Sequence, residues 1–213
     1  MSNNRVNEII ARLKQYYPQA VCSLDFERDP FRLLVMARLS AQCTDARVNI
    51  VAEKFFDTYK TIDDIIDADV ADIEQAIFSC GLYKTKARNI QAMARMIKED
   101  FNSAVPDNME DFLKLPGVGR KIANLILGDV FQKPAIVTDT HCIRISNRLG
   151  LTGSENPVKI EQDLIKIIPP EESSDFCHRL VLFGREYCRA RSPRCGECFL
   201  RDLCGYEMIS TIS

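Results

Sequence analysis

The stretch LPGVGRKIANLILGDVF, residues 115–131, contains a Pro-Gly-x-Gly turn followed at once by an apolar helix. Proline and glycine at these positions favour a tight turn whose backbone amides are not shielded by side chains. The N–H groups and the positive dipole end of the following helix face the same turn. The sequence therefore predicts two helices joined by a hairpin that binds an anion such as phosphate, and an ordinary helical corner is the alternative. The expected anion contacts come from Gly117, Val118, Gly119 and Arg120.

Lys121 lies at the start of the helix that follows this hairpin. Most lysines at a helix start are only solvated. A positive charge there, beside Arg120, is nevertheless disfavoured, and such a setting favours the neutral amine that acts as a nucleophile. A covalent amine catalyst also needs a carboxylate, and Asp139 in VTDTHCIRISNRLG, residues 137–150, follows one helix and one turn later. Asp139 is equally consistent with a simple helix N-cap.

Four of the nine cysteines fall in the 17-residue run CRARSPRCGECFLRDLC. Four thiolates near one point suit a tetrahedral zinc ion or an iron–sulfur cluster. Structural zinc sites usually have two close pairs of ligands, whereas here one close pair is flanked by longer arms, which favours a cubane cluster over zinc. The predicted ligands are Cys188, Cys195, Cys198 and Cys204. The other cysteines are predicted to be small buried core residues, namely Cys22, Cys43, Cys80, Cys142 and Cys177.

Composition limits the compartment and the partners. The N-terminus has no uninterrupted apolar stretch, and no segment approaches the ~20 apolar residues of a membrane span. An odd total of nine cysteines, four of them clustered, without an export signal indicates a reducing cytoplasm. The net charge of −2 does not reveal that acidic and basic residues are segregated along the chain. Residues 53–75 hold eight acids, and residues 184–194 hold four arginines. This strip permits a phosphate-facing surface, although a solvated charged face fits equally well.

Apolar residues recur with helical periodicity along the whole chain. Pro30 opens an almost entirely apolar helix, Thr44 and Thr61 are expected N-caps, residues 84–100 form a long amphipathic helix, and Asn156 precedes another. The only strand-like piece, at 135–137, is too short to anchor a sheet. The sequence therefore predicts an all-α protein.

Several separate motifs, in order, resemble bacterial endonuclease III, a DNA-repair glycosylase with abasic-site (AP) lyase activity. They are LPGVGRKIANLILGD, VTDTHCIRISNRLG, LLVMARLSAQCTD, GLYKTKARNI and the C-x6-C-x2-C-x5-C loop, and the resemblance runs from about residue 5 to 207. It implies two helical domains with the substrate cleft between them. One is a six-helix domain at 22–134 with a helix–hairpin–helix at about 107–131. The other joins 1–21 to 135–213 and holds a [4Fe-4S] cluster on the four clustered cysteines.

The resemblance also implies the chemistry. Lys121 would attack the anomeric carbon of the sugar, Asp139 would assist it, and the resulting Schiff base would permit β-elimination that nicks the strand 3′ to the lesion. The expected substrate is double-stranded DNA that contains oxidised pyrimidines or abasic sites, and the target base must leave the stack first. Gln42 and Leu82 would fill the gap, although Leu82 could instead pack under a loop. Further DNA contacts are expected from Thr140, His141, Arg185 and Arg191.

Two other interpretations stay open. A monofunctional mismatch glycosylase of the same superfamily usually lacks the hairpin lysine, and Lys121 argues against it. A non-catalytic helix–hairpin–helix DNA-binding module would not need both Lys121 and Asp139. We expect a monomer in the bacterial cytoplasm, at the nucleoid.

Overall fold

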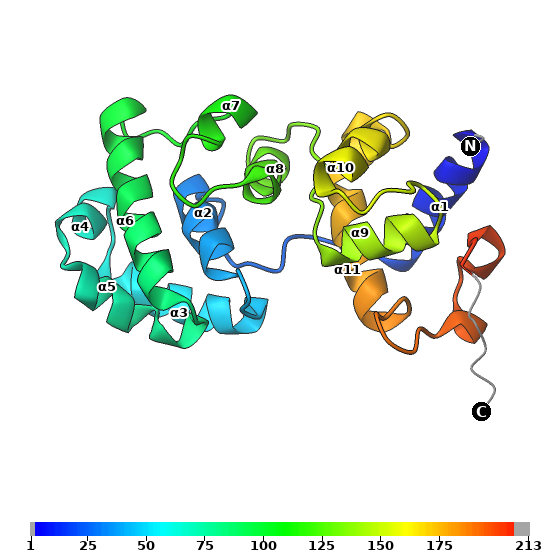
Figure 1. The fold of residues 1–213 in the computed structure, drawn as a ribbon, viewed down its shortest axis with the longest axis horizontal. Helices are drawn as coiled ribbons and strands as arrows, with labels where there is room; N and C mark the ends of the chain where they lie inside the picture. Colours follow the sequence, from blue (N-terminus) through cyan, green and yellow to red (C-terminus); the bar gives the residue numbers. More distant parts are fainter. Residues whose placement is uncertain (1–2, 207–213) are drawn as a thin grey trace. The chain divides into compact units, whose positions relative to one another are not determined.

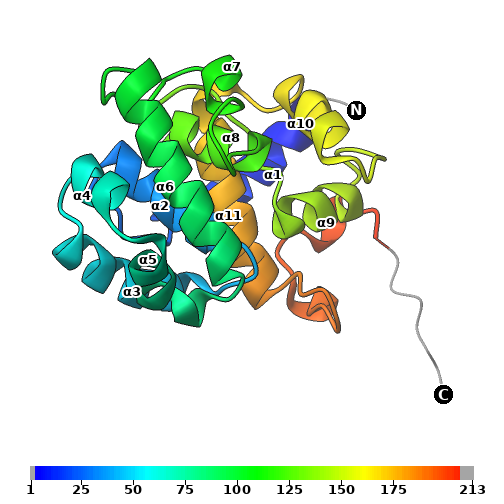
Figure 2. The same ribbon diagram turned by 60° about the vertical axis from the view of Figure 1, so that its left-hand side comes forward.

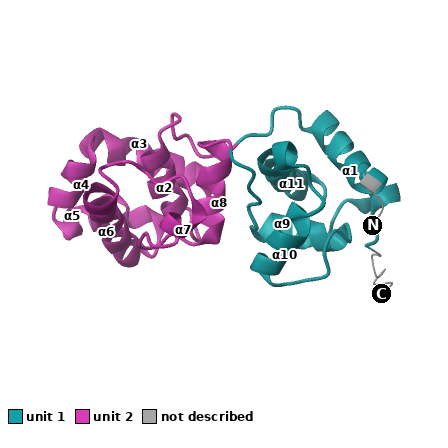
Figure 3. Ribbon diagram, turned by 90° about the horizontal axis from the view of Figure 1, so that it is seen from above, with its two compact units in different colours: residues 1–21, 133–213 teal, residues 22–132 magenta. Residues whose placement is uncertain are grey.

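The computed structural model describes residues 3–206, and within them the fold is all-α, which confirms the prediction (Figure 1). No strand occurs in that part of the chain, including the apolar run at 135–137. The chain divides into two compact units, residues 22–132 and residues 1–21 with 133–213 (Figure 3). Residues 1–2 and 207–213 lie outside the described part. No helix within that part is long and apolar enough to cross a membrane.

The unit 22–132 is built around α2. Asp29 caps this helix by accepting hydrogen bonds from the amides of Phe31 and Arg32, and Pro30 is its first residue. Except for Arg38, its residues from Leu33 to Leu39 are buried, and the helix contacts α3, α6 and α8, with α6 beside it in Figures 1 and 2. The helices of this unit are α2 (Pro30–Leu39), α3 (Asp45–Thr58), α4 (Ile62–Asp67), α5 (Val70–Ala76), α6 (Tyr83–Asp100), α7 (Met109–Phe112) and α8 (Arg120–Asp129).

The long helix α6 spans this unit and organises the short helices around it. Thr61 and Asp64 form a capping box that begins α4, and Gln91 of α6 donates to the carbonyl of Ala68 just beyond α4, at 2.8 Å. The α4 and α5 helices both pack on α6. In its described residues the unit has seven α-helices where the resemblance implied six, and the shortest, α7, packs against α8.

The other unit surrounds α11, which contacts both α9 and α1. The Phe199 ring stacks on Tyr16 of α1 at 3.7 Å and meets the edge of Phe183 of α11 at 5.3 Å. These rings join the two ends of the chain around one apolar centre, so the N-terminal helix and the cysteine-rich loop fold together. The elements are α1 (Asn3–Tyr16), α9 (Thr140–Arg148), α10 (Pro157–Ile165), α11 (Ser173–Glu186) and the 3-10 turns η2 (Pro170–Glu172), η3 (Cys195–Glu197) and η4 (Arg201–Leu203).

Candidate functional site

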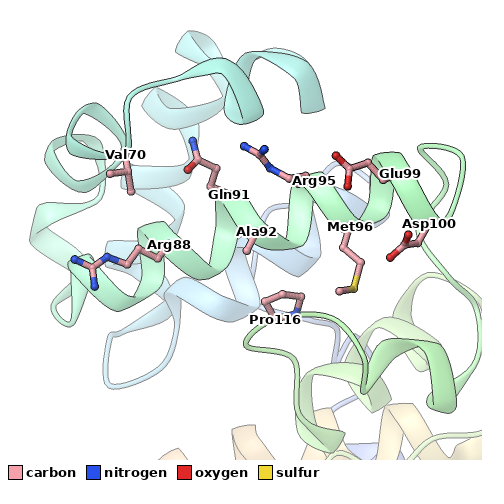
Figure 4. Close-up of a pocket in the computed structure, with 9 residues that line it drawn as sticks. All are labelled: Val70, Arg88, Gln91, Ala92, Arg95, Met96, Glu99, Asp100 and Pro116. Carbon is pink, nitrogen blue, oxygen red and sulfur yellow. The ribbon is translucent and has the colours of Figure 1, made fainter.

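The hairpin before α8 requires glycine at position 117 for two reasons. Gly117 has φ +79°, and a Cβ there would lie 2.7 Å from Arg38 Nε and from the side-chain amide of Asn89. With its amide oxygen turned to Arg38, Asn89 accepts from Arg38 Nη2 at 3.0 Å. This pair links α2 to α6, and the turn at Gly117 packs directly against it. Figure 4 shows Pro116 of the same turn facing α6 across a groove lined by Met96.

The start of α8 is arranged as an open helix N-terminus. Gly119 occupies the N-cap position, and no side chain caps the first turn. Val118 is buried, and its N–H donates to the Leu115 carbonyl at 3.1 Å, so this residue anchors the turn rather than exposing a free donor. Because the first amides of a helix have no partners within it, this end suits an anion. Lys121 is the second residue of α8, and it is exposed.

Asp139 caps α9 with one of its oxygens. Its Oδ1 accepts from the Cys142 amide at 2.7 Å, while Oδ2 lies 3.3 Å from His141 Nδ1. The side chain is 18% exposed. The two interpretations of Asp139 are therefore compatible, because the cap uses one carboxylate oxygen and the other is directed to the partly exposed His141. Thr140, the first residue of α9, is exposed.

Close packing against α11 fixes the orientation of α9. Gly184 lies so near α9 that a Cβ would be 2.5 Å from His141 Cδ2 and 2.8 Å from Arg144 Nη2. Arg144 in turn donates to the Cys188 carbonyl at 3.2 Å. The helix that begins at Asp139 is thus held by α11 on one side and by the cysteine-rich loop further along.

The four clustered cysteines line one cavity in the loop after α11. In the described part of the chain, however, no group of three or more Cys, His, Asp or Glu side chains is arranged to hold a single metal ion. Four cysteines around one cavity suit a cubane, in which each cysteine binds a different iron.

Polar contacts at this cavity also suit thiolate ligands. Arg148 Nη1 lies 3.4 Å from Cys188 Sγ and donates to the Arg189 carbonyl at 2.7 Å. Burial raises the pKa of the Cys188 and Cys198 thiols, so these ligands depend on the positive charge of bound iron to become thiolates. The donor set and its surroundings therefore fit an iron–sulfur cluster. When bound, such a cluster holds the loop in shape around its four ligands.

Gln42 and Leu82 are two of the seven non-glycine residues in the unit 22–132 whose backbone is left-handed. Gln42 has φ +56° and Leu82 has φ +48°, and both are exposed. Leu82 is 56% exposed, so its alternative interpretation as a residue packed under a loop is wrong. A non-glycine residue in the left-handed region costs free energy, and such strain often marks a functional site.

The arginines near the cluster loop differ in their surroundings. Arg185, Arg189 and Arg191 are exposed. Arg194 instead pairs with Glu197 and lies over the Tyr187 ring at 5.2 Å. The basic strip is therefore narrower than the sequence suggested.

Among the other cysteines, the predicted burial holds for three of five. Cys80, Cys142 and Cys177 are buried, but Cys22 and Cys43 are only half-buried, and each lies within a loop that connects two helices.

Sequence reasoning missed several residues that support the site. They are Arg38 and Asn89 below the hairpin, Gly184 against α9, Arg148 beside the cysteines, and Lys86, which is fully buried. Periodicity could have identified Lys86, because it lies four residues before buried Ile90 and seven before buried Met93 on α6. The other four act through tertiary contacts for which the sequence carries no local signal.

Comparison with known proteins places these features in one family. Residues 35–170 match the family described as HhH-GPD superfamily base excision DNA repair protein, and residues 188–204 match the iron-sulfur binding domain of endonuclease III. Endonuclease III of Synechocystis sp. is 47% identical over 94% of this chain and 91% of its own length.

Two solved structures share the fold. A trapped covalent endonuclease III–DNA intermediate superimposes with a TM-score of 0.91 at 42% identity, and 96% of each chain is covered. A thermostable thymine-DNA glycosylase gives a TM-score of 0.87 at 26% identity, over 96% of this chain and 97% of its own. The chain therefore belongs to the endonuclease III family of base-excision DNA-repair enzymes, with a [4Fe-4S] cluster on its C-terminal loop.

Proposed function

We propose that Lys121 and Asp139 carry out the glycosylase and AP lyase reactions of this family on oxidised pyrimidines in double-stranded DNA. Family membership makes the chain a DNA-binding base-excision-repair glycosylase and AP lyase. The observation that carries the assignment of residues is the position of Lys121. It is exposed, it is the second residue of a helix without a side-chain cap, and it directly follows the glycine hairpin. A phosphate bound at that hairpin would bring the sugar–phosphate chain to the amine.

The proposed chemistry begins at the sugar C1′ atom. The Lys121 amine forms a bond to C1′ as the bond between C1′ and the base breaks, and the base departs with the bonding electrons. Asp139 Oδ2, the oxygen not used by the cap, stabilises the positive charge that develops on the sugar and accepts a proton from the attacking amine. The ring then opens to a Schiff base between Lys121 and C1′.

The second step cleaves the strand. The Schiff base acidifies the C2′ proton, which passes to water as the C3′–O bond breaks and the phosphate departs with the bonding electrons on the downstream strand. A second water then hydrolyses the C=N bond and releases the lysine. Gln42 and Leu82 are proposed to occupy the space vacated by the flipped base, because both are exposed on strained tips. The hairpin amides of Gly117 and Gly119, together with Arg120, are proposed to bind the backbone phosphate, and Val118 anchors them. Thr140, His141, Arg185 and Arg191 are further proposed DNA contacts.

Analysis of the products tests this function. Incubated with a duplex that contains one oxidised pyrimidine, the protein should release the free base and leave a strand cut 3′ to the lesion by β-elimination. Release of the base from intact strands, or from a mismatched normal base only, would instead indicate a monofunctional mismatch glycosylase. Binding without either product would indicate a DNA-binding module. We propose further that the protein acts as a monomer in the bacterial cytoplasm, where its DNA substrate lies.

A further inference from the structure

Lys86 is a fully buried charged residue in the first turn of α6. Its ammonium group donates three hydrogen bonds of 2.8 Å, and all three acceptors are main-chain carbonyls, those of Leu39, Ala41 and Cys80. Burial lowers the pKa of Lys86. Burial beside Cys43 raises the pKa of the Cys80 thiol, so this thiol is protonated at neutral pH and offers Lys86 no negative charge. A cation held only by carbonyl dipoles requires a structural or functional reason.

The three carbonyls come from two loops that are far apart in the sequence. Leu39 is the last residue of α2, Ala41 lies in the turn that follows it, and the residue after Ala41 is Gln42, at φ +56°. Cys80 ends the 3-10 turn η1 (Phe78–Cys80), and two residues later comes Leu82, at φ +48°. The main-chain N–H of Lys86 also donates to the Leu82 carbonyl at 3.1 Å. One residue therefore contacts both loops immediately next to their strained, exposed tips.

Strained backbone of this kind persists only where surrounding contacts determine it. Three convergent donors on one ammonium can hold two independent loops at one spacing, which a neutral apolar side chain cannot do. Both tips lie in the unit 22–132, so their spacing belongs to a single folded body.

We propose that Lys86 is a positioning residue that sets the Gln42 and Leu82 tips at a fixed spacing before DNA binds, so that both enter the duplex together. This inference rests on the proposed insertion of these two side chains into DNA. Lys86 itself is too deeply buried to touch DNA. Its contribution belongs to the step in which the base leaves the stack and not to the chemistry at the sugar.

The test compares two substrates for Lys86→Met, which keeps an unbranched side chain as far as the ε position and removes every donor. Single-turnover excision of a paired lesion should slow by about tenfold, since the tips can no longer share the cost of unstacking the base. Strand cleavage at a pre-formed abasic site, where no base must be unstacked, should change by less than about twofold. Lys84→Met is the matched control: Lys84 is an exposed lysine two residues earlier on α6, and its loss should leave the ratio of the two rates unchanged.

A double-mutant cycle and hydrogen exchange complete the test. In a Leu82→Ala background, Lys86→Met should cost much less than in the parent, because residues that act as a unit are not additive. The amides of Cys43 and Gly81, which close turns in the two loops, should both exchange faster in Lys86→Met. If Lys86→Met does not fold, Lys86→Gln, which keeps up to two donors, must show the same selective loss.

Three results would overturn the inference. They are equal slowing on both substrates, full additivity with Leu82→Ala, and exchange that rises in one loop only. If the parent protein neither releases the base nor cuts the strand, the proposed function fails instead, and hydrogen exchange still decides whether Lys86 couples the two loops.

Discussion

Replacing Gly117 by alanine should destabilise the hairpin, and the structure gives the size of the effect. At φ +79° a side chain enters the left-handed region, which costs roughly 1–2 kcal/mol. The added Cβ would also lie 2.7 Å from Arg38 Nε and from the side-chain amide of Asn89, so these two side chains must shift and weaken the hydrogen bond between them, which costs about 1 kcal/mol. Together these terms predict a loss of about 2–3 kcal/mol from the unit 22–132.

Gly119→Ala is the matched control two residues away. At Gly119 the backbone has φ −105°, and nothing lies within 4 Å of an added Cβ. Alanine is a poorer N-cap than glycine, so we expect a loss below about 1 kcal/mol.

Urea unfolding followed by far-ultraviolet circular dichroism measures both changes. Gly117→Ala should also lower the affinity for duplex DNA, because it distorts the hairpin that is proposed to bind the backbone phosphate. Undamaged duplex is sufficient for this measurement, because a phosphate contact is independent of base sequence. If the free energies of unfolding of the two variants lie within about 1 kcal/mol of each other, the contact between the turn and the Arg38–Asn89 pair does not constrain the hairpin, and the reasoning is refuted.

The remaining predictions concern catalysis, base extrusion and pH. Asp139→Asn retains an oxygen that can accept from the Cys142 amide, so the melting temperature should stay near that of the parent while base excision falls by ~10²–10⁴-fold; excision at the parental rate would leave Asp139 as a cap only. Leu82→Ala should slow a paired lesion more than a pre-formed abasic site without loss of stability, because Leu82 is exposed; equal slowing would contradict insertion. Hydrogen bonds from Lys14 and Arg179 lower the pKa of Glu172. Its stabilising effect is therefore present above about pH 4.3, the value for an unperturbed glutamate, and is lost as the pH falls through its folded-state pKa. Acid titrations of stability should thus be less steep for Glu172→Gln than for the parent, and identical curves would remove Glu172 from the acid response.

Local rules explain why most helix starts could be predicted. Thr44, Thr61 and Asn156 each accept a hydrogen bond from the main chain within three residues, and such caps leave a sequence signal. Asp139 shows the limit of this reasoning. Its cap was foreseeable, but that Oδ2 faces His141 depends on how α9 packs.

Tertiary contacts account for what the sequence did not reveal. Periodicity places Lys86 on the buried face of the helix, but the convergence of carbonyls from two distant loops on its ammonium depends on tertiary structure. The sequence does not distinguish Gly184 from other helical glycines, because its importance comes from the close packing of α9 against it. Arg194 was grouped with the basic strip, but its ion pair with Glu197 and its stacking on Tyr187 direct it back onto the protein.

Borohydride trapping with Lys121→Gln tests the central claim most directly. The parent protein, incubated with an abasic duplex and borohydride, should give a covalent adduct, and peptide mass spectrometry should locate the reduced sugar on Lys121. Lys121→Gln should still bind the duplex, because the hairpin amides and α8 are unchanged, and should give no adduct. An adduct that persists in Lys121→Gln, or one located on another amine such as the N-terminus, would contradict the assignment of Lys121 as the nucleophile.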